Sequence, residues 1–214
     1  MIYTIMGKTG TGKSYFAAHL VDMLAKNRRL VAISDQEEDL EVLDEICGFQ
    51  NFYVFEIDSN NYKKINYAAE IQKYNNVGFV FTNLLEDEQN EIINEICSVI
   101  YRLGNAVFYI DEAHKFFPQN NYPIELERLI RGGRKRAIDV VLVTQQVIDL
   151  RKTALKQAHV GIFFRITEEN ELKKLRAMGI NAVKVASLPL HKCYVVDFIT
   201  GKSGVTSANE LAVW

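Results

Sequence analysis

The sequence has few of the residues that mark disulfide-rich or linker-rich proteins. Its 214 residues include three cysteines and three prolines. Cys47, Cys97 and Cys193 are widely spaced and odd in number, which argues against both disulfides and a zinc site. We therefore expect buried, reduced thiols and a cytoplasmic protein. Because so little proline argues against long linkers, we expect a single domain over residues 1–214.

Long hydrophobic runs and an excess of charge of one sign are also missing. No stretch approaches the roughly 18 apolar residues of a membrane-spanning helix, and no charged segment precedes an apolar one at the N-terminus. We expect neither a membrane span nor a signal peptide. The formal net charge of −2 excludes a generally basic nucleic-acid coat protein but allows a local basic surface. Hydrophobic residues make up 48% of the chain, enough for a substantial core.

Short apolar runs alternate with longer amphipathic stretches along most of the chain. This pattern is typical of the α/β class, in which a mostly parallel central sheet is flanked by helices. We expect strands at 2–6, 30–34, 52–57, 77–82, 106–111, 138–144, 159–166, 192–198 and 202–206. We expect helices at 14–26, 37–46, 61–74, 87–103, 122–134, 150–157, 168–178 and 180–187. Gly201, between the last two strands, indicates a hairpin and hence an antiparallel edge near the C-terminus.

One motif is complete, the phosphate-binding P-loop (Walker A motif) GKTGTGKS, which lies between the first predicted strand and the first predicted helix. This order makes a chance glycine-rich turn a poor alternative, because the loop glycines and the helix N-terminus together bind an anion. The residues expected to bind nucleotide are Gly7, Lys8, Thr9, Gly10, Thr11, Gly12, Lys13 and Ser14. Lys13 is expected to reach the β- and γ-phosphates, and the Ser14 hydroxyl to coordinate Mg²⁺.

A second motif follows the apolar run 106–110, which leads directly into Asp111 and Glu112. This is a Walker B pattern, and carboxylates at the carboxyl end of such a strand would lie beside the P-loop. We expect Asp111 to hold Mg²⁺ through its water shell and Glu112 to polarise the attacking water. The alternative, a helix N-terminus that favours acidic residues, accounts for one carboxylate but not for both. His114 is expected to be a hydrogen-bond partner between elements and not a catalytic group.

Two further features point to hydrolysis. Gln145 directly follows the predicted strand 138–144 and is expected to contact the γ-phosphate or the lytic water, although a plain polar loop residue is an alternative. Arg131 and Arg134 flank a pair of glycines, and we expect them near the catalytic edge of the sheet. Either could enter the site of a neighbouring subunit as an arginine finger. We weigh that role evenly against contact with nucleic acid.

The order GKTGTGKS, FYIDEAH and RGGRKRAIDVVLVTQQVIDLRK resembles the HerA/FtsK superfamily of P-loop ATPases. That superfamily includes DNA-translocating motors and viral genome-packaging ATPases, and its members typically form hexameric rings around DNA. The resemblance covers about residues 1–165. It implies the roles given above for the P-loop, Walker B and strand-end residues. It also assigns the trans arginine finger to Arg134, with Arg131 behind it.

The segment IDEAHKFFP also resembles phage-assembly ATPases related to zonula occludens toxin, which usually carry a membrane anchor. Because we expect no anchor and none of the DNA-guiding domains of the chromosomal members, the chain is similar to small viral packaging ATPases. The resemblance implies an ATP- and Mg²⁺-dependent motor that translocates double-stranded DNA as a homo-hexamer. A capsid or membrane portal protein would be a further partner. A viral protein of this kind would reside in the host cytoplasm or the virion.

Basic residues are expected to grip the DNA backbone without reading its sequence, namely Lys135, Arg136, Arg151 and Lys152. Three alternatives stay open. The chain could be an assembly or secretion ATPase that acts on protein, a small-molecule kinase, or a nucleotide-gated module without turnover. The carboxylate of Glu112 argues against the last of these, and the acidic pair followed by a Thr-Gln strand end favours hydrolysis over phosphoryl transfer to a metabolite.

Overall fold

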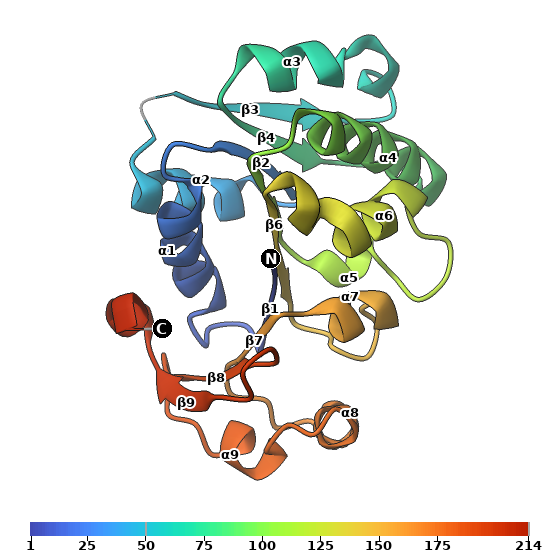
Figure 1. The fold of residues 1–214 in the computed structure, drawn as a ribbon. Coiled ribbons are helices and arrows are strands. Elements are labelled where there is room, and N and C mark those ends of the chain that lie inside the picture. The colour runs from blue at the N-terminus through green and yellow to red at the C-terminus, as the bar shows by residue number, and fades with distance from the viewer. Residues whose placement is uncertain (50, 214) are drawn as a thin grey trace.

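A twisted nine-stranded sheet runs through the described part of the chain, in the order β3-β4-β2-β5-β6-β1-β7-β8-β9 (Figure 1). The computed structural model describes residues 1–49 and 51–213, except for the side chains of 211–213. The strands are β1 Ile2–Met6, β2 Arg29–Ser34, β3 Phe52–Ile57, β4 Asn76–Phe81, β5 Ala106–Ile110, β6 Ile138–Thr144, β7 Val160–Phe163, β8 Cys193–Asp197 and β9 Ser203–Thr206.

The strand directions agree with the sequence prediction. β1 pairs in parallel with β6 and β7, and β5 pairs in parallel with β2 and β6. β8 is antiparallel to β7, and β9 is antiparallel to β8, which confirms the antiparallel edge near the C-terminus. The loops that follow β1, β5 and β6 therefore emerge side by side at the carboxyl edge of the parallel strands.

Helices cover both faces of the sheet. The α-helices are α1 Lys13–Ala25, α2 Glu37–Cys47, α3 Tyr67–Lys73, α4 Glu86–Leu103, α5 Ala113–Phe116, α6 Ile124–Gly132, α7 Lys152–Gln157, α8 Glu169–Ala177 and α9 Ala182–Ala186. Short 3₁₀ helices are η1 Tyr62–Lys64, η2 Gly133–Arg136 and η3 Ala208–Val213. α1 and α2 lie on one side, and α4, α6 and α7 lie on the other (Figure 1).

The central strands read as continuous apolar runs because both of their faces are buried. In β5, Val107 and Tyr109 pack with α1 and α2, whereas Phe108 and Ile110 pack into the larger core with α4 and α6. Cys97 and Cys193 are buried and Cys47 is half-buried, all three as free thiols, in agreement with the prediction. No helix among the described residues is long and apolar enough to cross a membrane.

Most predicted elements differ from the observed ones by a few residues at their ends. The predicted helix at 61–74 is wrong in one respect, because it is split into η1 and α3. Asn66 starts α3 by accepting a hydrogen bond from the Ala69 N–H through its side chain. The helix predicted at 122–134 ends at Gly132 and continues as the 3₁₀ turn η2. α5 and η3 were not expected.

Candidate nucleotide-binding site

The P-loop joins β1 to α1 at the carboxyl edge of the sheet. Two of its glycines are required by the geometry. A Cβ on Gly7 would lie 2.5 Å from the Cβ of Phe164, so no larger residue fits there. Gly12 has a φ of 99°, a left-handed conformation that glycine adopts at little cost, immediately before the first turn of α1. The loop therefore places the N-terminus of α1 where an anion can bind its free N–H groups.

Lys13 lies inside this loop. Its side chain is buried, and Nζ donates a hydrogen bond to the Lys8 carbonyl at 2.8 Å. The Thr11 hydroxyl donates to the same carbonyl at 2.7 Å. Burial lowers the pKa of Lys13, while the carboxylates of Glu112 and Asp111 act in the opposite direction. Lys13 thus lies between the loop and two acidic groups. Its positive charge can there interact with a bound polyphosphate.

Asp111 follows β5 and is almost fully buried. Oδ2 accepts a hydrogen bond from the Tyr109 hydroxyl at 2.6 Å, and Oδ1 accepts one from the Glu112 N–H at 2.8 Å. Burial, with a further contribution from Asp39, raises the pKa of Asp111 to about 6. A nearby cation would oppose this shift, because it favours the ionised carboxylate.

The donor set fits Mg²⁺. The Ser14 hydroxyl and the Asp111 carboxylate are hard oxygen ligands on one cavity, the kind that Mg²⁺ prefers. Among the described residues, no cluster of three or more His, Cys, Asp or Glu side chains could hold a metal ion alone. A metal here would therefore take its remaining ligands from phosphate and water, as Mg²⁺ usually does.

Glu112 has two direct partners, Gln145 and His114, and each of these is held in turn by a threonine. The Gln145 side-chain amide donates to its Oε1, and the Thr9 hydroxyl donates to the Gln145 carbonyl oxygen. His114 Nδ1 lies 3.2 Å from Oε2 of Glu112 and 3.0 Å from the Thr144 hydroxyl. His114 thus links the ends of β5 and β6, as predicted. Gln145 connects the P-loop to the Walker B glutamate.

These contacts set the charge of Glu112. Burial by itself raises its pKa, but hydrogen bonds from His114 and Gln145 and the charge of Lys13 outweigh burial, so the pKa lies below its ordinary value. The backbone of Glu112 is left-handed, with a φ of 43°, a conformation that non-glycine residues adopt mostly where the surroundings hold them. The geometry thus presents an ionised carboxylate beside the P-loop.

One cavity of about 480 Å³ brings the two motifs and Gln145 together. Its lining comprises Thr9, Gly10, Gly12, Lys13, Ser14, Tyr15, Gln36, Asp39, Asp111, Glu112 and Gln145. Tyr15, Gln36 and Asp39 were not predicted to line this cavity. The available signal for Asp39 was a polar Ser34 at the end of the buried strand β2, followed by an acidic first turn of α2. The Ser34 hydroxyl donates to Asp39 at 3.0 Å.

The expected position of Arg131 and Arg134 near the catalytic edge is wrong. Both precede β6, so they lie at the amino edge of the sheet, a strand length of about 20 Å from the residues that follow β6. Arg131 pairs with Glu127 at 2.7 Å on the exposed side of α6. Arg134 is exposed in the 3₁₀ helix η2, which precedes β6. Neither arginine reaches the cavity of its own chain.

Of the basic residues expected to hold DNA, two interact with other groups of the protein and two are exposed. The guanidinium of Arg151 pairs with Glu127 at 3.0 Å and lies 3.3 Å from the centroid of the Tyr122 ring. Arg151 therefore stabilises the fold, but it also lines a groove with Lys152 and Lys174, and its contact with DNA stays a prediction. Arg136 donates to the Arg102 carbonyl at 2.8 Å. Lys135 and Lys152 are exposed.

Residues 1–208 match the family model of zonular occludens toxin (Zot). The chain belongs to the Zot family. No curated protein sequence matches this Zot-family chain significantly.

Several solved structures share the fold of this Zot-family protein. The genome packaging NTPase B204 of Sulfolobus turreted icosahedral virus 2, in complex with AMPPCP, matches with a TM-score of 0.72 and 19% identity over 96% of each chain. VirB4 of Thermoanaerobacter pseudethanolicus matches with a TM-score of 0.68 and 11% identity, over 96% of this chain and 88% of that one. ATPases 2 and 3 of EccC from Thermomonospora curvata match with a TM-score of 0.61 and 11% identity, over 96% of this chain and 36% of that one.

These identities are low, so the likeness concerns the fold. The P-loop NTPase fold predicted from the sequence is confirmed. The resemblance to the Zot-related branch is confirmed, and the resemblance to viral packaging ATPases is confirmed at the level of the fold.

Proposed function

We propose that this protein is an Mg²⁺-dependent ATPase that translocates double-stranded DNA, as in packaging of a viral genome. One observation carries the proposal. A single cavity holds Lys13 of the P-loop, the carboxylates of Asp111 and Glu112, and the amide of Gln145. The similarity to a genome packaging NTPase supports DNA as the load.

The chemistry follows from the contacts of each residue. Lys13 and the N–H groups of the loop bind the polyphosphate, while Ser14 and Asp111 would hold Mg²⁺, which neutralises charge on the phosphates. Glu112 is the acceptor that orients and polarises water, since its lowered pKa keeps it ionised at neutral pH. We propose that, in doing so, it exchanges its Gln145 hydrogen bond for one to water. Gln145 thereby senses which state the site is in.

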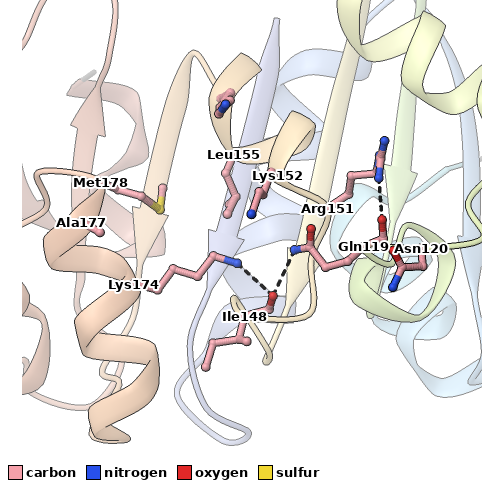
Figure 2. A pocket seen from close by; sticks show the side chains of 10 residues that line it. Gln119, Asn120, Ile148, Arg151, Lys152, Leu155, Lys174, Ala177 and Met178 are labelled. Carbon is pink, nitrogen blue, oxygen red and sulfur yellow. Dashed lines mark hydrogen bonds between the residues drawn. The ribbon is translucent and has the colours of Figure 1, made fainter.

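A hydrogen-bonded segment connects Gln145 to a surface groove. The loop between β6 and α7 is held by Lys174 of α8, whose Nζ donates to the carbonyls of Val147 at 2.7 Å and Ile148 at 2.9 Å. Gln119 donates to the Ile148 carbonyl at 3.1 Å (Figure 2). A change in the position of Gln145 would therefore move the loop between β6 and α7, which is hydrogen-bonded to α8.

The groove next to this loop suits a polyanion. It encloses about 860 Å³ between α7 and α8, and Lys152, Lys156 and Lys174 line it. None of its described lining residues is acidic. We infer that the DNA backbone contacts the exposed Lys152 and Lys156, while Lys174 holds the loop, so that loss of the γ-phosphate at Gln145 is passed to the load. Such contacts carry no sequence information and weaken with salt.

An arginine that acts on the nucleotide of a neighbouring subunit requires an assembly of several subunits, such as a ring. Because Arg134 lies at the amino edge and is exposed, it can only serve the cavity of a neighbouring subunit. We propose a homo-hexamer in which Arg134 of one subunit faces the γ-phosphate of the next, with Arg131 as a second candidate. Three more elements of the proposal are a single ATPase domain over residues 1–214, a capsid or portal protein as partner, and location in the host cytoplasm or virion.

A second candidate is an assembly or secretion ATPase that acts on protein. It is favoured by the apolar side chains of Leu155, Met178 and Ile148, which line the same groove as the lysines. A peptide with apolar and acidic side chains would match such a surface.

One experiment separates the two. ATPase rate and assembly state are measured on the same preparation, with and without double-stranded DNA, over a range of salt concentrations. A DNA motor is expected to assemble and to hydrolyse ATP faster with DNA at low salt, and to lose the stimulation as salt rises. ATP turnover that ignores DNA at every salt concentration would reject the DNA motor and favour the protein-directed ATPase.

A further inference from the structure

His114 and Thr144 lie beside the nucleotide cavity but have no part in the proposed chemistry. β5 and β6 are neighbours in the sheet and pair in parallel, with Ile110 opposite Leu142. His114 comes soon after the end of β5, and Thr144 is the last residue of β6. Thr144 is fully buried, and the side chain of His114 is only 11% exposed. Polar groups at this depth must find hydrogen-bond partners within the protein.

The hydroxyl of Thr144 has a full set of partners. It donates to the Gln146 carbonyl at 3.3 Å, and its oxygen accepts from the Gln146 N–H at 3.1 Å. The same oxygen lies 3.0 Å from Nδ1 of His114. Because the only hydroxyl proton is engaged by Gln146, Nδ1 is the donor in its contact with Thr144.

The second contact of Nδ1 requires the same proton. Nδ1 lies 3.2 Å from Oε2 of Glu112, and a carboxylate only accepts hydrogen bonds. Oε2 is fully buried, and within the described part of the chain it has no hydrogen-bonding partner other than the His114 ring. Both contacts therefore place a proton on Nδ1, where a neutral imidazole carries it in only one of its two tautomers.

We propose that His114 is a positioning residue for hydrolysis. It holds Oε2 of Glu112 in place through the proton on Nδ1, and Thr144 keeps that proton on Nδ1. The proposal rests on the proposed function in one respect, the role of Glu112 as the acceptor that polarises water.

Glu112 needs this support because its other oxygen changes partners. Oε1 accepts from the Gln145 amide, and the proposed function has it exchange this bond for one to water. His114 is then the protein group that still holds the carboxylate. Without it, the side chain could turn about its own single bonds and carry Oε1 away from the water, and a catalytic group must keep its geometry for the reaction to proceed.

The two oxygens of Glu112 are held by groups of one turn. Gln145 holds Oε1 directly, whereas Thr144 acts on Oε2 through the ring of His114. The Thr144 hydroxyl is in turn bonded to both backbone groups of Gln146. Thr144 therefore anchors the turn that carries Gln145, so that Gln145 can change partners through its side chain while the His114 contact stays.

The first test separates positioning from packing through kcat and KM. His114→Ala should lower kcat by roughly 10- to 100-fold, the contribution of a hydrogen bond to a charged group. KM and the affinity for ATP should hardly change, because His114 does not line the nucleotide cavity. His114→Asn should restore most of the turnover, since its amide nitrogen can donate from about the position of Nδ1. A parallel loss of affinity, or no rescue by asparagine, would point to packing and overturn the proposal.

A double substitution shows whether His114 acts through Glu112. In Glu112→Gln the carboxylate is already lost, so the addition of His114→Ala should lower the residual turnover no further. If the two losses multiply, His114 acts independently of Glu112 and the positioning role is wrong.

The role of Thr144 is tested by the tautomer of the ring. Nitrogen NMR distinguishes a proton on Nδ1 from one on Nε2, and the His114 signal is identified by its absence in His114→Asn. The wild-type protein and Thr144→Ser, which keeps the hydroxyl, should show the Nδ1–H tautomer. Thr144→Val should show a mixture of the two and a smaller loss of kcat than His114→Ala. A wild-type ring with its proton on Nε2 would reject the proposal whatever the rates.

His159→Ala is the control for loss of a histidine elsewhere. His159 is half-buried at the amino edge, where its Nδ1 accepts the Ile2 N–H at 3.1 Å, and its removal should leave kcat unchanged. If the wild-type protein hydrolyses no ATP, the proposed function fails and the positioning role falls with it. If it hydrolyses ATP and His114→Ala keeps full kcat, the positioning role alone is wrong and the ATPase stands.

Discussion

The two edges of the parallel sheet carry polar residues of very different kinds. At the carboxyl edge, Lys13, Asp111 and Glu112 converge on one cavity, and their pKa values are shifted by burial and by one another. At the amino edge, Arg28 donates to Asp139 at 2.6 Å and to the carbonyls of Ala106 and Ala137. The first group is gathered around space for a ligand, whereas the second satisfies groups of the protein itself.

This contrast teaches how to read charge in a parallel sheet. Both edges of the sheet carry polar residues next to apolar strands. At the carboxyl edge, the loops that follow the neighbouring strands β5, β6 and β1 lie together, and the last of them is the glycine-rich P-loop. At the amino edge, Arg28 forms an ion pair within the protein, whereas Arg134 is exposed to solvent. Outward-facing charges act only on another molecule.

The largest expected effect comes from breaking the carboxyl edge. Lys13→Ala should abolish nucleotide binding, because it removes the cation that faces the phosphates. Glu112→Gln should keep binding and lower turnover by roughly 10²-fold or more, because only the acceptor for the water is lost. Calorimetry and steady-state ATPase assays measure the two effects. Equal losses of binding in both variants would contradict the separate roles.

The next effect tests whether the amino edge of one subunit completes the carboxyl edge of another. Arg134→Ala should be inactive alone, with a loss of roughly 10³-fold. Mixing it with Glu112→Gln subunits should restore part of the turnover, since one interface then has both an intact finger and an intact glutamate. Arg131→Ala is the matched comparison. No recovery at any mixing ratio would count against action in trans.

A third prediction concerns the closed part of the amino edge. Arg28→Ala should lower the free energy of unfolding by about 2 kcal/mol, because Asp139 and two carbonyls lose a donor at a half-buried site. Chemical denaturation measures this, and nucleotide affinity should stay unchanged. Arg176→Ala, which breaks an exposed ion pair with Glu169, should have no measurable effect on stability. A loss of nucleotide affinity in Arg28→Ala would contradict the claim that Arg28 at the amino edge contributes to stability alone.

The smallest effect concerns Asp39 in the carboxyl edge. Burial raises its pKa, against the hydrogen bond from Ser34. Between its ordinary and its raised pKa, the native state binds more protons than the unfolded state, so stability falls as pH rises through that window. Asp39→Asn should therefore slightly raise the melting temperature of the nucleotide-free protein at pH 7.5 but not below the window. An equal shift at both pH values would point to packing and not to charge.

The strands and the two nucleotide motifs could be predicted because their signals are local. A strand buried on both faces is expected to be apolar, and β5 shows this over its whole length and β6 from Val140 to Val143. The break between η1 and α3 escaped prediction because one capping side chain, Asn66, outweighs the helical pattern on either side. The partners of Arg151 could not be predicted, because Glu127 and Tyr122 are distant from it in sequence.

Local chemistry was therefore legible in the chain: a P-loop needs its glycines, lysine and serine within eight consecutive residues, and Walker B needs its carboxylates directly after an apolar strand. Everything that depends on strand order was decided by folding. Asp39 joins the site only because β2 pairs with β5, and His191 meets Gly12 only because β8 is added to β7. Pairing between distant strands depends on summed burial across the whole sheet, which no single segment encodes.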